Sequence, residues 1–531
     1  MTDCRRHSVL ALLSLLVATA PIGSCSSASD NTEEAEGGHR RLNWRKRARG
    51  DKRRLNWRKR ARGDKFPSLA DLGDPKTVIP RYDAAAVADV SGPPNIIYIQ
   101  HESLSGSIAL NTEAGGEAMP FLWTMMRHHP DFYVFEHART VSGNTLDALP
   151  ALMTGCMPYT QDAEDWLHEP GRSVGYDFRR LGYHTGSFCS RRLDKSITTG
   201  HWSVLHDLLV GSMDTVVDPV SGKWPKDNKE GADDRRTLPP FEKWLRELSE
   251  KDESRPFYAQ FYNFNQHYPY MEQKGAPKST SRYYQSLATT DEFFLGLFEI
   301  LEKTDYLKNT IIVGSGDHGE EPFKKAFYAR LRAYNSNILQ TASYIYYPKH
   351  LMPDPSMAVQ LRSNTQKMVH TTDFYQTLQG IIRRTFTKEG EQDLNVAPTG
   401  CITGVDLAEV NIPEDRVVIS WNLYSGRVSG SFKGDYWALS TKKASLYHRK
   451  QEKRLPQLKQ GKNNEYVLEY GVCTRDTSRS NLCQTSLTAE YMDYFRGAIQ
   501  WIKDTPLYDE GVKTSQLVEF FGDMVGWKEA T

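Results

Sequence analysis

The sequence predicts an α/β fold in which a mostly parallel sheet is flanked by helices and followed by a small α+β unit. Short, continuous apolar runs, typical of strands buried on both faces, alternate along the chain with amphipathic segments. This alternation favours a parallel sheet with helices on both faces. The predicted strands span residues 95–100, 132–138, 184–189, 257–264, 310–317 and 342–348.

The clearest helix is predicted over residues 290–306, where apolar residues recur at helical spacing. Near residue 415 the pattern changes to shorter strands with hairpin-like breaks, followed by a predicted helix at 488–504. We therefore predict a main domain over residues 91–414 and a C-terminal α+β subdomain over residues 415–531.

Residues 1–27 have the features of a secretion signal. Arg5 and Arg6 precede an apolar run, Ser8 to Ala20, which is shorter than the roughly 20 residues of a membrane span. The alternative is a lipid-attachment site at Cys25. The sequence thus predicts a secreted or lumenal chain, or one anchored by lipid at Cys25, with no transmembrane segment in the mature chain.

Residues 28–90 are predicted to be a disordered linker. The segment RRLNWRKRARGDK occurs at 40–52 and again at 53–65, and it is too basic and too poor in aliphatic residues to bury a core. It is a solvated spacer, a processing site or an anion-binding arm. The whole chain has a net charge of +1, so we expect no nucleic-acid partner.

The cysteines allow a disulfide in an oxidising compartment. Cys473 and Cys483 are close enough in sequence to close a short loop. No C-x-x-C pair is present, which argues against a structural zinc knuckle. Five cysteines follow the signal, so one must stay unpaired: Cys156, Cys189, Cys401, Cys473 and Cys483.

Polar residues follow three of the predicted strands. Glu102 follows the first strand, His267 the fourth, and Asp317 and His318 the fifth. The carboxyl ends of parallel strands are where open α/β sheets bind ligands, so we expect one site there. Two carboxylates and an imidazole suit one divalent cation, Zn²⁺ or Mn²⁺ in preference to Mg²⁺ or Ca²⁺.

Thr145 lies just ahead of an apolar run, in GNTLDALPALMTG. With Asn144 and Asp147 it suits a helix cap. It also suits a nucleophile, because a bound cation would lower the pKa of its hydroxyl and a helix N-terminus favours an anionic ester. The residue is therefore either a cap or a nucleophile.

The order of these motifs resembles the sulfatase and alkaline-phosphatase superfamily. PPNIIYIQHESLSG resembles its first strand and metal-binding acid, TLDALPALMTG its nucleophile signature, and IIVGSGDHGEE its second metal motif. The resemblance runs from Asn95 to the end of the chain. It implies an alkaline-phosphatase-like fold in which Glu102, Thr145, Asp317 and His318 bind the metal.

The nucleophile motif departs from that of sulfatases that use formylglycine. Those enzymes have Cys or Ser at the nucleophile, then Pro two residues on and Arg four residues on, where this chain has Thr145, Asp147 and Leu149. Thr cannot become formylglycine. A single Glu, a Thr and an Asp-His pair resemble instead the lipoteichoic-acid synthase and phosphoethanolamine transferase branch, which carries membrane helices.

The resemblance also implies residues that bind the substrate. Arg191 and Arg192 lie where sulfatases place a Lys and a His on the anionic ester, and guanidinium groups suit sulfate or phosphate oxygens. A solvated pair is the alternative. His267 matches a substrate-binding histidine that would protonate the leaving oxygen.

The resemblance therefore implies a metal-dependent hydrolase or transferase with Thr145 as the nucleophile. Its substrate would be a sulfate or phosphate ester of a glycan, a lipid or a small molecule. The alternative is a catalytically inactive binding protein with the sulfatase fold.

Overall fold

The computed structural model describes residues 92–158, 171–193, 205–224, 231–251, 255–272, 281–322, 336–386 and 401–413, the strands between 418 and 472, and positions 80, 166, 169 and 416. The signal, the tandem repeat, Cys473, Cys483 and the helix at 488–504 lie outside the described residues, so those predictions stay predictions. Among the helices that are described, none has both the length and the apolar character needed to cross a membrane.

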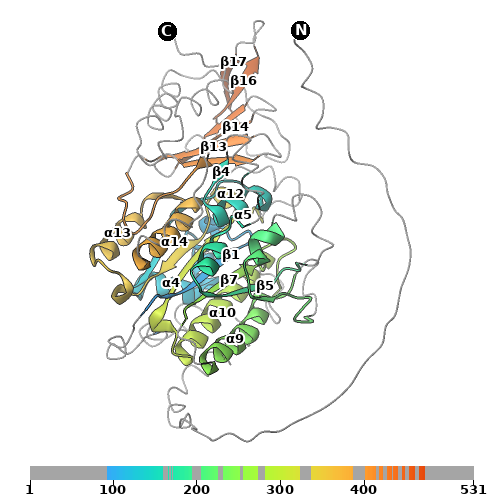
Figure 1. Cartoon of the computed structure of the whole chain (residues 1–531). Coiled ribbons are helices and arrows are strands. Elements are labelled where there is room, and N and C mark those ends of the chain that lie inside the picture. The colour runs from blue at the N-terminus through green and yellow to red at the C-terminus, as the bar shows by residue number, and fades with distance from the viewer. Residues whose placement is uncertain are drawn as a thin grey trace, which may run out of the picture. The chain divides into compact units, whose positions relative to one another are not determined.

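A seven-stranded sheet lies at the centre of the described residues before residue 415 (Figure 1). Strand β9 runs antiparallel to both its neighbours, and the other pairings are parallel. The prediction of a mostly parallel sheet is confirmed. The order is β2 (Phe132–Phe135), β9 (Ser343–Tyr346), β8 (Thr310–Gly316), β1 (Asn95–His101), β7 (Phe257–Asn263), β5 (His184–Cys189) and β6 (Thr215–Val217).

Both faces of this sheet are buried under helices, which explains the continuous apolar strands. On β1, Ile97 and Ile99 enter one core cluster, whereas Ile96 and Tyr98 enter the other, because successive side chains point to opposite faces. The first cluster includes residues of α4 (Pro120–His128), α9 (Leu238–Glu250) and α10 (Arg282–Lys303), and the second includes residues of α5 (Thr145–Thr154), α7 (Val174–Arg180) and α14 (Thr371–Thr385).

Helix α10 begins at Arg282, eight residues before the predicted start at residue 290. The buried face of its first half includes polar residues. The apolar spacing that predicts a helix is therefore weak before residue 290. Asp291 is one of these polar residues: its carboxylate accepts the backbone N–H groups of Phe121 and Leu122 at 2.9 and 2.8 Å. This buried acid therefore caps the start of α4, whose first residue is Pro120.

A disulfide joins two distant parts of the chain. Cys156 is bonded to Cys401, 245 residues further on, beside the antiparallel pair formed by β4 (Met157–Pro158) and β11 (Cys401–Ile402). Cys189 is a free, buried cysteine, and burial raises the pKa of its thiol to about 12. The sequence did not indicate this pairing.

Beyond residue 415 the described residues form a six-stranded antiparallel sheet in chain order. The short strands agree with the expected change of pattern, and the domain boundary itself stays a prediction. The strands are β12 (Val418–Asn422), β13 (Arg427–Phe432), β14 (Asp435–Ser440), β15 (Ser445–His448), β16 (Arg454–Gln460) and β17 (Tyr466–Val472).

Candidate metal and nucleophile site

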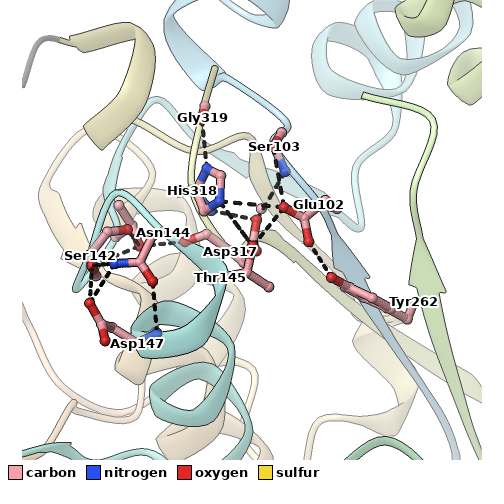
Figure 2. Close-up of polar contacts among 12 residues, drawn as sticks. Glu102, Ser103, Ser142, Asn144, Thr145, Asp147, Tyr262, Asp317, His318 and Gly319 are labelled. Atoms are coloured by element: carbon pink, nitrogen blue, oxygen red, sulfur yellow. Dashed lines mark hydrogen bonds and ion pairs between the residues drawn. The ribbon is translucent and has the colours of Figure 1, made fainter. Parts of the chain in front are cut away.

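Strands β1 and β8 end side by side, because His101 pairs with Gly316 in parallel register. The chain therefore leaves the same edge of the sheet at Glu102 and at Asp317, with His318 next. All three side chains are buried. One ligand atom from each lies within 4.8 Å of the others. Figure 2 shows the three side chains pointing toward one another.

Each carboxylate has one oxygen held by another part of the protein. Glu102 Oε2 accepts the hydroxyl of Tyr262, a fully buried residue of β7. Asp317 Oδ1 accepts the backbone N–H groups of Ser103 at 2.9 Å and of His318 at 2.7 Å. Glu102 Oε1 and Asp317 Oδ2 are the oxygens that remain on the side of the imidazole.

His318 is held in the same way. Its Nδ1 lies 2.7 Å from the carbonyl oxygen of Gly319, which only accepts, so the proton of that contact belongs to Nδ1. Its Nε2 lies 3.4 Å from Glu102 Oε1, 3.7 Å from Asp317 Oδ2 and 3.2 Å from Thr145 Oγ1. The backbone contact thus directs Nε2 at the other three groups.

Helix α5 is capped by Asn144, the residue before Thr145. Asn144 has an extended backbone, and its side-chain oxygen accepts the backbone N–H of Asp147 at 3.3 Å. Thr145 is the first helical residue, and its hydroxyl leaves the helix to donate to Glu102 Oε1 at 2.7 Å. The side chain is partly exposed, unlike the buried groups around it. The cap and the candidate nucleophile are therefore two different residues.

The pKa values reflect two buried carboxylates that share one imidazole. Burial alone would raise the pKa of Glu102, but the hydrogen bond with His318 and the charges of His267, His318 and Arg191 lower it below its usual range. Burial and the charge of Glu102 raise the pKa of Asp317 to about 7. Burial opposes the charge on His318, yet Asp317 and Glu102 raise its pKa to about 10. The two carboxylates thus attract a cation.

These residues fit a divalent cation. Asp317 Oδ2 is buried and has no hydrogen-bond partner in the described structure, a costly arrangement for a carboxylate oxygen unless a cation binds it. Glu102 Oε1, His318 Nε2 and Thr145 Oγ1 complete a set of oxygen and nitrogen donors. Such a set suits one divalent metal ion.

The turn after β1 is shaped to support this cluster. Ser103 has a φ of 63°, a left-handed conformation uncommon for a residue with a side chain. The hydroxyl of Tyr283 donates to Ser103 O and accepts the N–H of Ser105, both at 2.9 Å. Tyr283, on α10, therefore holds the turn that aims the Ser103 N–H at Asp317. No sequence pattern singled out either residue.

Two of the three candidate substrate-binding residues, Arg191 and His267, meet at one aromatic ring. The Arg191 guanidinium carbon lies 5.1 Å from the centre of the Phe264 ring. The His267 ring stacks on Phe264 with a centroid distance of 4.3 Å and an interplanar angle of 17°. The charges of Arg191 and His267 both lower the pKa of Glu102, so both act on the ligand cluster. Arg192 is partly buried, and its role stays a prediction.

A sequence model of the sulfatase family matches residues 94–380, more than half of the chain. The chain belongs to the sulfatase family. The predicted resemblance to the sulfatase and alkaline-phosphatase superfamily is confirmed. Members of this superfamily include sulfatases, phosphatases and phosphotransferases, which act on sulfate or phosphate esters and depend on metal ions.

Solved structures of superfamily members resemble this sulfatase-family chain at low sequence identity. A protein of the alkaline phosphatase superfamily from Vibrio parahaemolyticus is 14% identical, with 83% of this chain and 90% of that chain covered and a TM-score of 0.48. The lipoteichoic acid synthase LtaP from Listeria monocytogenes is 14% identical, with 80% and 98% covered and a TM-score of 0.46. The soluble domain of lipooligosaccharide phosphoethanolamine transferase A from Neisseria meningitidis is 14% identical, with 61% and 95% covered and a TM-score of 0.43. No curated protein matched the chain.

Proposed function

We propose that this sulfatase-family protein is a metal-dependent hydrolase or transferase of sulfate or phosphate esters that uses Thr145 as its nucleophile. The observation that carries the proposal is the hydroxyl of Thr145, which lies 2.7 Å from Glu102 Oε1 and 3.2 Å from His318 Nε2. Because Asn144 already caps α5, helix capping does not account for Thr145.

Four residues would hold one divalent cation: Glu102, Thr145, Asp317 and His318. When bound, the cation would lower the pKa of the threonine hydroxyl and offset the negative charge of the ester. The N-terminus of α5 adds partial positive charge where an anionic ester would lie. Zn²⁺ or Mn²⁺ suits these donors better than Mg²⁺ or Ca²⁺.

The reaction would proceed through a covalent threonine ester. Thr145 Oγ1 loses its proton to solvent and forms a bond to phosphorus or sulfur, and the bond from that atom to the leaving oxygen breaks. His267 gives a proton to the leaving oxygen. Water or an acceptor hydroxyl then gives a proton to His267 and attacks the threonine ester, and the Thr145 oxygen leaves and takes a proton from solvent.

Arg191 and His267 support an anionic substrate. Arg191 is 6% exposed, and its charge acts on Glu102, so an ester beside Thr145 would lie within its field. A guanidinium group can donate two parallel hydrogen bonds to phosphate or sulfate oxygens. We assign Arg192 to the same substrate contact. The substrate would be a sulfated or phosphorylated glycan, lipid or small molecule.

The disulfide supports a secreted or lumenal location. Disulfides persist mainly in oxidising compartments, and Cys156 and Cys401 are both buried and bonded to each other. This agrees with the secretion signal predicted over residues 1–27. A lipid anchor at Cys25 would place the protein in the same kind of compartment.

The proposal is tested with Thr145→Ala and Thr145→Ser on a panel of aryl sulfates, phosphate monoesters and phosphate diesters. Thr145→Ala should abolish turnover while the melting temperature stays close to wild type and Glu102, Asp317 and His318 retain most of the bound metal. Thr145→Ser keeps the oxygen and should retain measurable turnover. A folded, metal-loaded Thr145→Ala protein with near-normal turnover would refute the nucleophile. A wild-type protein that binds metal but turns over no member of the panel would favour the inactive binding protein.

A further inference from the structure

Tyr262 binds the side of Glu102 that faces away from the candidate cation site. Its hydroxyl donates to Glu102 Oε2, whereas Thr145 and His318 lie against Oε1 (Figure 2). Tyr262 is 1% exposed, so water does not compete for this contact. Neither the sequence pattern nor the family resemblance singled out this residue.

The sheet register explains how Tyr262 reaches Glu102. Tyr262 pairs with Gln100 in parallel register, and Glu102 lies two residues beyond Gln100 on the same chain. The backbone N–H of Glu102 also donates to the carbonyl oxygen of Asn263 at 2.9 Å. Strand β7 thus holds Glu102 by its backbone and by one carboxylate oxygen.

The arrangement limits what Glu102 offers to a ligand. With Oε2 engaged by Tyr262, only Oε1 is directed at His318 and Thr145. We propose that Tyr262 is a positioning residue that keeps Glu102 a single-oxygen ligand and thereby makes the site prefer zinc to calcium. This inference rests on the cation site of the proposed function.

The preference follows from coordination chemistry. Zn²⁺ usually takes four ligands, one atom from each residue, whereas Ca²⁺ takes six to eight oxygens and often binds both oxygens of a carboxylate. Asp317 is restricted likewise, because two backbone N–H groups occupy Oδ1. Removing the Tyr262 hydroxyl would release Glu102 Oε2 and leave Asp317 unchanged.

The chain offers a matched control on the same strand. Tyr258 is also fully buried on β7, and its hydroxyl contacts Gln260 Oε1 at 3.1 Å rather than the ligand cluster. Tyr258→Phe and Tyr262→Phe each remove one buried hydroxyl and keep the ring. A general loss of stability would appear in both variants, whereas a change in metal preference should appear in one.

The experiment measures dissociation constants for Zn²⁺ and for Ca²⁺ by calorimetry on the metal-free full chain. In Tyr262→Phe the dissociation constant for Zn²⁺ should rise by about 10–100-fold, as is typical when a hydrogen-bond partner of a metal ligand is lost. The dissociation constant for Ca²⁺ should stay the same or fall. Tyr258→Phe should keep the wild-type ratio. The absorption spectrum of bound Co²⁺ should weaken in Tyr262→Phe, because Glu102 then provides a second oxygen.

If folded Tyr262→Phe keeps the wild-type ratio of the zinc and calcium dissociation constants, the inference is overturned. This holds whether both constants stay unchanged or both rise by the same factor. If the wild-type chain binds neither ion, the cation site of the proposed function fails as well. If thermal unfolding shows that Tyr262→Phe does not fold, Tyr262→Gln replaces it. That variant keeps an N–H donor beside Glu102, so it should keep the zinc preference, and a lost preference overturns the inference.

Discussion

Thr145 donates its hydroxyl to Glu102 Oε1 at 2.7 Å, although 43 residues separate the two along the chain. The contact spans from the first residue of α5 to the end of β1. A residue that served only to cap the helix would turn its oxygen toward the backbone of its own first turn. Asn144 does this instead, so the two neighbours can be separated by mutation.

Asn144→Ala should destabilise the protein by about 0.5–2 kcal/mol, because Asp147 N–H loses its acceptor at the start of α5. Bound metal should be retained, since Asn144 is not among the ligands. The measurement is urea unfolding beside metal analysis. Unchanged stability in Asn144→Ala, together with a large loss in Thr145→Ala, would assign the cap to Thr145.

Removing the cation should destabilise the folded chain, because the buried carboxylates of Glu102 and Asp317 then have only His318 to offset their charge. At a free Zn²⁺ concentration about one hundred times the dissociation constant, binding should add about 2.7 kcal/mol of stability. Thermal unfolding after chelation and after zinc is restored measures this. His318→Ala is the control, and it should lose most of the response. A melting temperature that changes neither with chelator nor with added zinc would contradict the proposed cation site.

The sequence was informative where a residue's role follows from its place on one element. Glu102, Asp317 and His318 follow buried strands, and parallel strands bring their carboxyl ends to one edge, so their meeting was predictable. Thr145 was singled out because it begins a helix. For this residue the sequence left two roles open, helix cap and nucleophile. In the structure Asn144 is the cap of α5.

Contacts between distant segments were not predictable in this way. Tyr262 reaches Glu102 across 160 residues, and which side chain of β7 does so depends on the register with β1. The left-handed turn at Ser103 is held by the hydroxyl of Tyr283, which lies on helix α10. Cys156 and Cys401 are 245 residues apart, and no local pattern records such a pairing.

The buried acid Asp291 should make stability depend on pH. Burial raises its pKa from 3.8 to about 7, so the folded chain holds a proton that the unfolded chain has lost. Stability should therefore fall as the pH rises from about 4 to about 7, by at most about 1.4 kcal/mol per pH unit, and level off above 7. Urea unfolding across this range measures the slope.

The matched variant for that slope is Asp291→Asn, which cannot ionise. Asp234 and Asp317 also have pKa values raised to about 7 and contribute with the same sign, so only the difference between variant and wild type isolates Asp291. The variant should be less stable at low pH, because it loses an acceptor at the start of α4. Identical slopes in the two proteins would show that Asp291 stays ionised.

The Cys156–Cys401 disulfide should stabilise the fold by about 2–4 kcal/mol, because it closes a long loop in the unfolded chain. The double variant Cys156→Ala/Cys401→Ala should lose this stability and respond less to reductant than wild type. Cys189→Ala should still respond, since Cys189 is the free cysteine of the described residues. Equal sensitivity to reductant in the double variant and in wild type would contradict this pairing.

The central claim, a covalent ester on Thr145, is tested most directly by mass spectrometry of protein quenched during turnover of the best substrate of the panel. A phosphoryl or sulfuryl group should appear on the peptide that contains Thr145, and on the serine of Thr145→Ser, but not in Thr145→Ala. The group should disappear once the substrate is exhausted. Turnover in which the Thr145 peptide stays unmodified at every quench time, or in which the group resides on another residue, would contradict the claim.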